Sequence, residues 1–456
     1  MELLNNQKVN FNVKAGSISG DKFFHICCWL FLVCFFFTPD GFGFYLGFLF
    51  NAKRIFMFML YGMIIFNKKR LNQFWQDVKS YKVINIVLGL YMFVRIYTAV
   101  YRTSLKSFTN DFLDVVLVLY IFLYLLKHEL SVVKLQKIIE NGLLVLSIFA
   151  VIEFSTGFNF FSLLDTADQF ITEISRLNSA RVTSICRHAI ITGWYFSFLG
   201  FFTCIDFEKN KLYLFRRPIH FLLSMIVIFM TGSRAPIGLF FVGIVLILIF
   251  SNKDQLIKSL IIIAILLIIF SFVIIVTYNT SFAQYILRMI TSAIDGVFGT
   301  TLSYQFGGER FIASTEYREA LKKVFYLDYF NKFIGRGVGY ELSVVIDGYW
   351  LMSCDNAYVG MYIIFAYPGL ITFILLLLLC LIYMAICFFK YKNRAAAGLM
   401  GIFIPYVLLI WNVALMGSFM CIMAILAIVY TLFINEKQKR KGEDNAIENY
   451  QRRIRH

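Results

Sequence analysis

Long apolar blocks without charge constrain this chain more than any other feature of its sequence. Residues 256–277 contain a single charged side chain, Lys258, and residues 365–389 contain none. A helix needs about 20 apolar residues to cross the hydrocarbon core of a bilayer. Strands of a membrane barrel would instead alternate polar and apolar residues over about 10 positions. Blocks of this kind therefore predict transmembrane helices.

The composition extends this interpretation to the whole chain. Of its 456 residues, 60% are hydrophobic and only 15% are charged, whereas soluble domains carry about 25% charged residues. We therefore predict an all-α polytopic membrane protein with about 12 transmembrane helices. The expected spans are 23–39, 46–66, 82–100, 110–126, 136–154, 186–206, 217–231, 235–251, 256–277, 364–389, 396–415 and 418–434.

The basic residues predict which side of the membrane each loop faces. The formal net charge is +16, but its lysines and arginines stand in short clusters between apolar blocks. Such clusters mark cytoplasmic loops, so they do not indicate nucleic-acid binding. The sequence predicts a cytoplasmic N-terminus (1–22), a transmembrane domain (23–434) and a cytoplasmic tail (435–456). The clusters lie at 68–70, 209–217, 390–394 and 437–441.

Two long loops, 155–185 and 278–363, then face outward. We expect the membrane to be a bacterial inner membrane, so that these loops lie in the periplasm. The second loop is nearly balanced in charge, unlike the cytoplasmic loops. Long loops are usually functional. A helix is predicted around residues 317–325 from its apolar stripe, with Ser314 or Thr315 as its cap.

Arginines concentrate in these outward segments. Arg181, Arg187 and His188 stand where the loop enters the sixth predicted span, and Arg234 follows a Thr-Gly-Ser turn between two short spans. Anchoring at the lipid headgroups is the alternative role for such arginines, and His188 is more often a packed side chain than a catalyst. A charge so close to hydrocarbon usually meets a partner or a polar cavity.

The late loop adds further candidates. Arg310 and Arg318 precede and lie on its predicted helix, where a surface role with a Glu319–Lys323 pair is the alternative. Asp355, Asn356 and Tyr358 stand at the start of the tenth span, where the first two can equally cap the helix. Residues 335–339, Gly-Arg-Gly-Val-Gly, are interpreted as a tight turn and not as a nucleotide loop.

Taken together, the arginines indicate a class of ligand that no one of them indicates alone. Guanidinium groups stay charged and bind phosphate oxygens in a bidentate fork. An outward cavity lined by Arg181, Arg234 and Arg318 would suit a diphosphate that is attached to a lipid.

In these stretches the sequence resembles the O-antigen polymerase and O-antigen ligase superfamily of membrane glycosyltransferases. The resemblance covers about residues 180–370 and implies a GT-C-like architecture. Where the ligases carry a histidine before the asparagine, this chain has Asp355, which favours a polymerase. The motifs, in family order, are Arg181-Val-Thr-Ser, Thr231-Gly-Ser-Arg-Ala-Pro, Arg318-Glu-Ala-Leu, Ile334-Gly-Arg-Gly-Val-Gly339 and Asp355-Asn-Ala-Tyr through Pro368-Gly369.

By this resemblance the chain joins undecaprenyl-diphosphate-linked repeat units by glycosyl transfer at the periplasmic face. Arg234, Arg318 and Asp355 would be catalytic, and Asp355 would orient the acceptor hydroxyl or act as general base. The implied partners are the lipid-linked oligosaccharides, membrane lipid and a chain-length regulator protein. No cofactor and no metal are expected. The diphosphate would be bound by Arg181, Arg187, His188, Arg310, Asn356 and Tyr358.

Three alternatives stay open at this point. A ligase would transfer finished polymer to lipid A–core. A lipid-glycan flippase or transporter would carry charges deep within several spans, whereas here such charges are few, notably Arg95. The third alternative is a structural partner of a polysaccharide assembly complex.

Overall fold

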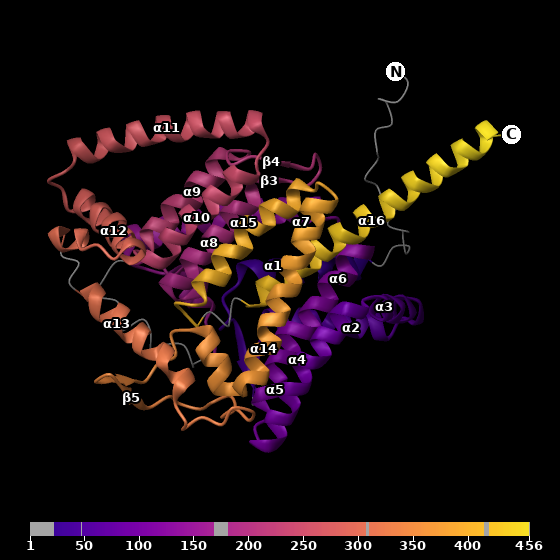
Figure 1. The fold of residues 1–456 in the computed structure, drawn as a ribbon, viewed down its shortest axis with the longest axis horizontal. Coiled ribbons are helices and arrows are strands. Elements are labelled where there is room, and N and C mark those ends of the chain that lie inside the picture. The colour runs from indigo at the N-terminus through magenta and orange to yellow at the C-terminus, as the bar shows by residue number, and fades with distance from the viewer. Residues whose placement is uncertain (1–21, 47, 168–180, 307–309, 415–418, 456) are drawn as a thin grey trace.

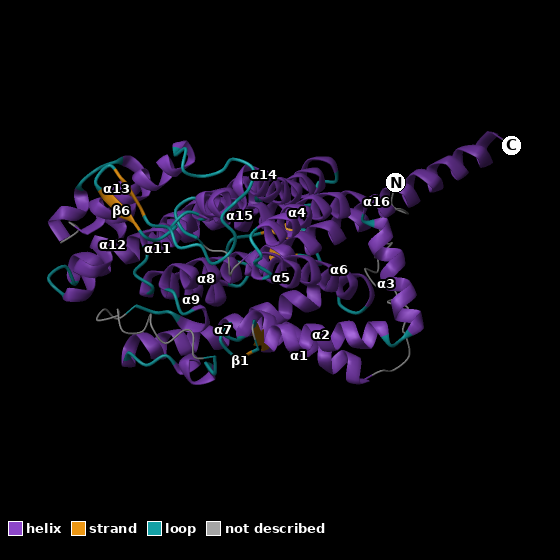
Figure 2. Ribbon diagram, turned by 90° about the horizontal axis from the view of Figure 1, so that it is seen from below, coloured by secondary structure: helices purple, strands orange, loops and turns teal. Residues whose placement is uncertain are grey.

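Helices form nearly all of the computed structural model, which describes residues 22–46, 48–167, 181–306, 310–414 and 419–455 (Figures 1 and 2). The described strands pair as three antiparallel hairpins: β1 (Gly43–Tyr45) with β2 (Leu49–Asn51), β3 (Ile205–Asp206) with β4 (Lys211–Leu212), and β5 (Val344–Ile346) with β6 (Tyr349–Leu351). The α-helices are α1 (Lys22–Phe37), α2 (Ala52–Ile65), α3 (Lys68–Ser80), α4 (Lys82–Tyr101), α5 (Lys106–Asp111), α6 (Val118–His128), α7 (Val132–Thr156), α8 (Ala189–Thr203), α9 (Pro218–Met230), α10 (Arg234–Phe250), α11 (Lys253–Val276), α12 (Ser281–Phe298), α13 (Arg310–Lys322), α14 (Ala357–Ala385), α15 (Arg394–Leu409) and α16 (Phe419–Arg455).

The helices have the composition of a membrane protein. Within the described residues, six are long and apolar enough to cross a bilayer, and five shorter helices are also apolar. The chain is therefore an all-α membrane protein. The six long ones are Lys82–Tyr101, Lys106–His128, Val132–Thr156, Lys253–Val276, Ala357–Lys390 and Phe419–Gly442. The second of these joins α5 to α6 through a π-helical turn at Phe112–Leu117.

Loops that the charge pattern places on one side of the membrane meet at one end of the bundle. His128 Nε2, at the end of α6, lies 2.6 Å from Asp77 Oδ2 of α3. This contact joins the end of α6 to α3. The backbone N–H of Arg394 donates to Asn210 Oδ1 at 2.7 Å, and its Nη1 donates to the Phe250 carbonyl at 2.7 Å. Alternate crossings of a membrane would produce this grouping.

The other loops meet at the opposite end, which we call the loop end; it carries residues 299–306 and 310–356. Arg102 Nε donates to the Gly335 carbonyl at 2.7 Å. Tyr97 Oη donates to the Phe333 carbonyl at 2.5 Å. The late loop is therefore fastened onto the end of α4.

Side-chain caps explain where many of the helices begin. Asn51, Ser131, Thr280 and Asn393 each accept a backbone N–H from the first turn of α2, α7, α12 and α15, which satisfies donors that the helix itself leaves open. At the other ends, α7 and α12 stop at glycines in the left-handed conformation, Gly157 and Gly299. Glycine adopts this conformation without the steric cost that a Cβ brings.

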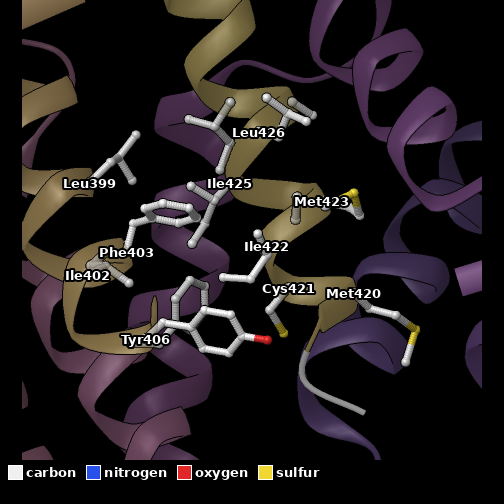
Figure 3. Packing of buried hydrophobic residues seen from close by; sticks show 14 of the residues in the cluster. Leu399, Ile402, Phe403, Tyr406, Met420, Cys421, Ile422, Met423, Ile425 and Leu426 are labelled. Atoms are coloured by element: carbon white, nitrogen blue, oxygen red, sulfur yellow. The ribbon is translucent and has the colours of Figure 1, made fainter. Parts of the chain in front are cut away.

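Close helix packing depends on small residues facing each other. Gly243 of α10 lies against α15, where a Cβ would come within 3.0 Å of the Gly401 carbonyl oxygen. Such small pairs let helix backbones approach in membrane proteins. Figure 3 shows the adjoining layer, where Phe403 and Tyr406 of α15 pack against Ile422 and Ile425 of α16.

Helix α14 is broken inside the bundle. Ala366 has φ 55° and Pro368 follows it, so the carbonyls before the break cannot be satisfied within the helix. The carbonyls of Ile363 and Ile364 instead accept backbone N–H groups of Arg336 and Gly337, at 2.8 and 3.0 Å. Residues 335–339 thus serve as the turn that completes the broken helix.

Several sequence boundaries were wrong. The predicted span 46–66 begins with the β1–β2 hairpin, so its helix starts only at Ala52 and places Lys53 and Arg54 in the first turn. Helix α13 begins at Arg310, so Ser314 and Thr315 lie inside it and do not cap it.

Two helices lie at the edges of the structure. Helix α11 runs along the top of Figure 1, where Ile262, Ile263 and Leu266 pack against the core and Ser259 is its one buried residue. Helix α16 continues through the predicted tail 435–456 as far as Arg455 and extends to the C-terminus at the upper right.

Candidate functional site

The turn between α9 and α10 forms the centre of the site. Gly232 has φ +59°, a conformation that favours glycine. Arg181 binds this turn through two hydrogen bonds. Its Nε donates to the Thr231 carbonyl at 2.9 Å, and its Nη2 donates to Ser233 Oγ at 2.6 Å. Part of the Arg181 guanidinium therefore serves to position the residue that follows, Arg234.

Arg234 directly precedes the predicted span 235–251 and is the first residue of α10. Burial and the neighbouring charge of Arg318 lower the pKa of its guanidinium to about 10, with a raising effect from Asp295 and a further lowering effect from Arg181. Like charges perturb a pKa only when they are close. The charges of Arg318 and Arg181 thus act on Arg234, although the three arginines lie on separate segments of the chain.

Helix α12 contributes residues that the sequence analysis missed. Tyr285 Oη donates to the Phe229 carbonyl at 3.3 Å, and the Arg288 guanidinium lies 5.7 Å from the Tyr285 ring centroid. Burial raises the pKa of the Tyr285 hydroxyl, and the charges of Arg181 and Arg288 oppose that rise. Helix α12 therefore brings a fourth arginine, Arg288, to the turn.

The third residue of interest on α12 is Asp295, which is held by hydrogen bonds from the residues that follow the helix. Its carboxylate accepts hydrogen bonds from Thr300 Oγ1 at 2.6 Å and from the backbone N–H of Leu302 and Ser303, both at 2.8 Å. Burial acts to raise the pKa of Asp295, but these hydrogen bonds outweigh it and lower the pKa to about 2. The carboxylate of Asp295 therefore stays ionised at neutral pH.

Two guanidinium donors in this group lack partners. The Nε atoms of Arg288 and Arg318 are buried, and neither has a hydrogen-bond partner among the described residues. Buried donors normally find an acceptor, because leaving one unmade costs about 1–3 kcal/mol. An anion with several oxygens is the kind of ligand that would satisfy both.

Contacts of α13 and of the residues just after it fasten the segment that carries Arg318. Tyr317 Oη donates to the Ser353 carbonyl at 2.8 Å, and Lys323 pairs with Asp347 at 2.6 Å. The predicted pairing of Glu319 with Lys323 was wrong, since Glu319 pairs with Lys322 at 2.5 Å. The predicted apolar stripe packs into a second core, whose buried members on this side are Ala320, Leu321 and Val324.

Asp355, Asn356 and Tyr358 divide between different roles. Asn356 is buried and caps α14, since its Oδ1 accepts from the N–H groups of Tyr358 and Val359 at 2.9 and 3.1 Å. Tyr358 Oη donates to the Val407 carbonyl at 3.1 Å. Asp355 accepts from Ser353 Oγ at 2.8 Å through Oδ1 alone. Asp355 is therefore the member of this trio that keeps an oxygen available for chemistry.

The remaining candidates from the sequence are Arg187, His188 and Arg310. Arg187 forms an ion pair with Asp165. Both side chains lie beside Gly41 in the loop after α1, where an added Cβ would meet them. His188 occupies the N-cap position of α8 without a side-chain cap hydrogen bond. Arg310 begins α13, and its side chain lies outside the described residues.

A second charged group lies between α2, α4 and α5. Arg95 is fully buried, and its Nε donates to Asp111 Oδ2 at 2.7 Å. Arg54 grips both oxygens of Asp114, at 2.9 and 2.5 Å. Each of these two arginines therefore has a carboxylate partner.

No family model and no curated protein matches this chain. In the part of the chain that the structure describes, no three His, Cys, Asp or Glu side chains are grouped as metal ligands. The fold thus defines an α-helical membrane protein whose candidate site is an arginine cluster at the loop end.

Proposed function

We propose that this protein is a membrane glycosyltransferase that polymerises lipid-linked oligosaccharides. The observation that supports the proposal is the arginine cluster: the charges of Arg318 and Arg181 act on Arg234, and Arg181 donates to the Thr231 carbonyl in the turn between α9 and α10. A diphosphate attached to a lipid combines an anionic head with a tail that must stay in the membrane. An arginine cluster at the edge of the hydrocarbon fits that combination.

The proposed reaction transfers a glycan from one polyprenyl diphosphate to another lipid-linked repeat unit. A hydroxyl oxygen of the acceptor sugar attacks the anomeric carbon of the donor and forms the new glycosidic bond. The bond between that carbon and the diphosphate oxygen breaks, and its electron pair leaves with the polyprenyl diphosphate. Fixed guanidinium groups stabilise the charge that builds up on the leaving group.

The proton of the acceptor hydroxyl needs a base. Asp355 suits this role, because Ser353 engages only its Oδ1. The carboxylate adjoins Ser353, which contacts Tyr317, the residue before Arg318 on α13. Base and leaving-group site are therefore linked through neighbouring residues of the loop end.

A lipid-glycan transporter is the second candidate. The observation in its favour is the fully buried Arg95 with its partner Asp111, since ionisable residues inside a membrane often mark a transport path. A transporter would move the lipid-linked glycan across the bilayer without making a glycosidic bond. The product therefore separates the two candidates.

The test is the surface polysaccharide of cells that lack the chain and are complemented with variants. We expect Arg234→Ala and Arg318→Ala to leave only single-repeat products while the protein stays in the membrane. Lys323→Gln removes an exposed cation from the same loop and should leave chain length unchanged. Normal chains from both arginine variants would overturn the site. Complete absence of attached repeats in the deletion strain would indicate a ligase instead.

A further inference from the structure

An apolar groove runs between α10 and α12, beside the arginine cluster. Its volume is about 360 Å³, and its walls include Gly238, Val242 and Val245 of α10 and Ile290, Ala293 and Ile294 of α12. Nothing in the walls can pair with a polar ligand. The groove therefore suits a hydrocarbon chain.

The groove and the arginine cluster share one face of α10. Arg234, Gly238, Val242 and Val245 are spaced four, four and three residues apart, which places them along one side of the helix. On the opposite wall, Asp295 directly follows Ile294 and acts electrostatically on Arg234. The polar and apolar parts of this surface are thus continuous, with the positive charge at one end.

The groove is also open toward the bilayer. Phe241 on its rim is 45% exposed and Val245 is 52% exposed. Helix α11, which follows α10 in the chain, contributes no residue to the lining of the groove. A lipid tail can therefore enter sideways from the hydrocarbon.

We propose that this groove holds the first isoprenoid units of the lipid diphosphate whose head lies on Arg234 and Arg318. The inference rests on the proposed function and names where the lipid portion of that substrate lies. Charge complementarity selects this occupant: a positively charged end continues into a purely apolar channel, which matches an amphiphile with an anionic head.

Gly238 determines how wide the groove is near the head. A Cβ added there would meet no atom within 4 Å. The protein packing therefore does not require glycine at this position, and the missing side chain leaves open space. Glycine in a helix interior is less stable than alanine. Its presence one turn from Arg234 is explained by the need for space for the ligand.

The test uses the full-length protein in lipid nanodiscs and a long-chain polyprenyl diphosphate with a photoreactive diazirine in its third isoprenoid unit. We expect cross-links within residues 238–246 and 290–294, suppressed by excess inorganic diphosphate. Gly238→Phe should lower them at least about tenfold, because each methylene excluded from the groove is worth about fourfold in affinity. Ala293→Phe blocks the groove from the other wall and should act in the same direction.

The matched control is Gly89→Phe on α4, where a Cβ also meets no atom within 4 Å; cross-linking should stay unchanged. Cross-links on another face, or undiminished labelling in both groove variants, would overturn the inference. Equal labelling by the uncharged polyprenol with the same tail would show that the groove takes any lipid chain, which also overturns it.

The experiments distinguish an error in the groove proposal from an error in the proposed function. If the groove is labelled but lipid-linked repeats are not elongated, the glycosyltransferase proposal fails and the tail site stands. If elongation depends on Arg234 and Arg318 while the tail labels another surface, the groove fails and the function stands.

Discussion

Replacing Gly232 with alanine introduces a methyl group where three parts of the site meet. At φ +59°, the new Cβ would lie 2.6 Å from Tyr285 Oη and 3.6 Å from Arg181 Nε. The left-handed conformation costs alanine about 1–2 kcal/mol. Moving Tyr285 breaks its hydrogen bond to the Phe229 carbonyl, which is worth about 1 kcal/mol. We expect the free energy of unfolding to fall by about 2–3 kcal/mol.

Gly157 provides a control with the same backbone requirement. Its φ is +73°, but no atom lies within 4 Å of an added Cβ. Gly157→Ala should therefore cost only the conformational part, about 1–2 kcal/mol. Equilibrium unfolding of the purified variants in mixed detergent micelles measures both values.

The double variant Gly232→Ala/Tyr285→Phe isolates the steric contact. Removal of the Tyr285 oxygen removes the clash, so the two changes should be less harmful together than their sum, with a coupling of about 1 kcal/mol. Polymer formation should fall in Gly232→Ala, since Tyr285 shares α12 with Arg288, and should persist in Gly157→Ala. Equal destabilisation at both glycines together with strict additivity would refute the reasoning.

Three further predictions follow from the same geometry. Arg288→Gln and Arg318→Gln should each lower kcat/KM for polymerisation about 100-fold with folding retained, and unchanged rates would remove these arginines from the site. Asn356→Ala should lower the free energy of unfolding by about 1–2 kcal/mol, because the helix loses its cap. Tyr358→Phe should keep activity. If either variant lost activity without losing stability, the replaced side chain would have a chemical role. Asp295 has a folded pKa of about 2, below its ordinary 3.8, so its stabilisation is present above pH 3.8 and fades as the pH falls toward 2. Asp295→Asn should therefore be less stable than the wild type at pH 7 and should approach it near pH 2, and a constant difference in thermal unfolding would contradict this.

The helices were predictable because the membrane restricts the choice. Continuous apolar blocks leave few alternatives to a helix, and each predicted span contains one in the structure. The basic clusters likewise predicted which loops gather at one end, as the contact between Asn210 and Arg394 shows. Which compartment that end faces remains a prediction from charge.

Boundaries near the loop end were harder to predict, for physical reasons. The β1–β2 hairpin is as apolar as the helix that follows it, so hydropathy could not separate Leu49–Asn51 from Ala52. Helix α12 was missed because the loop was judged by its charge balance. Its apolar residues Ala283, Ile286 and Met289, buried three apart, were the signal that would have found it.

Only part of the site could be predicted from residue type and motif order. The charges of Arg181 and Arg318 act on Arg234, and a shared ligand for the three stays a prediction. Arg187 instead pairs with Asp165, a contact made across loops that no local pattern reveals. Arg288 was missed together with its helix.

The central claim is that the arginine cluster activates a lipid diphosphate for glycosyl transfer. The most direct measurement is incubation of the purified chain, in vesicles, with a synthetic polyprenyl-diphosphate-linked repeat unit, followed by mass analysis of the glycans and of the released lipid. We predict oligomers of the repeat, one free polyprenyl diphosphate for each new bond, and loss of both in Arg234→Ala and Arg318→Ala. Unreacted repeat units with the folded wild-type protein, or equal product from those variants, would contradict the account.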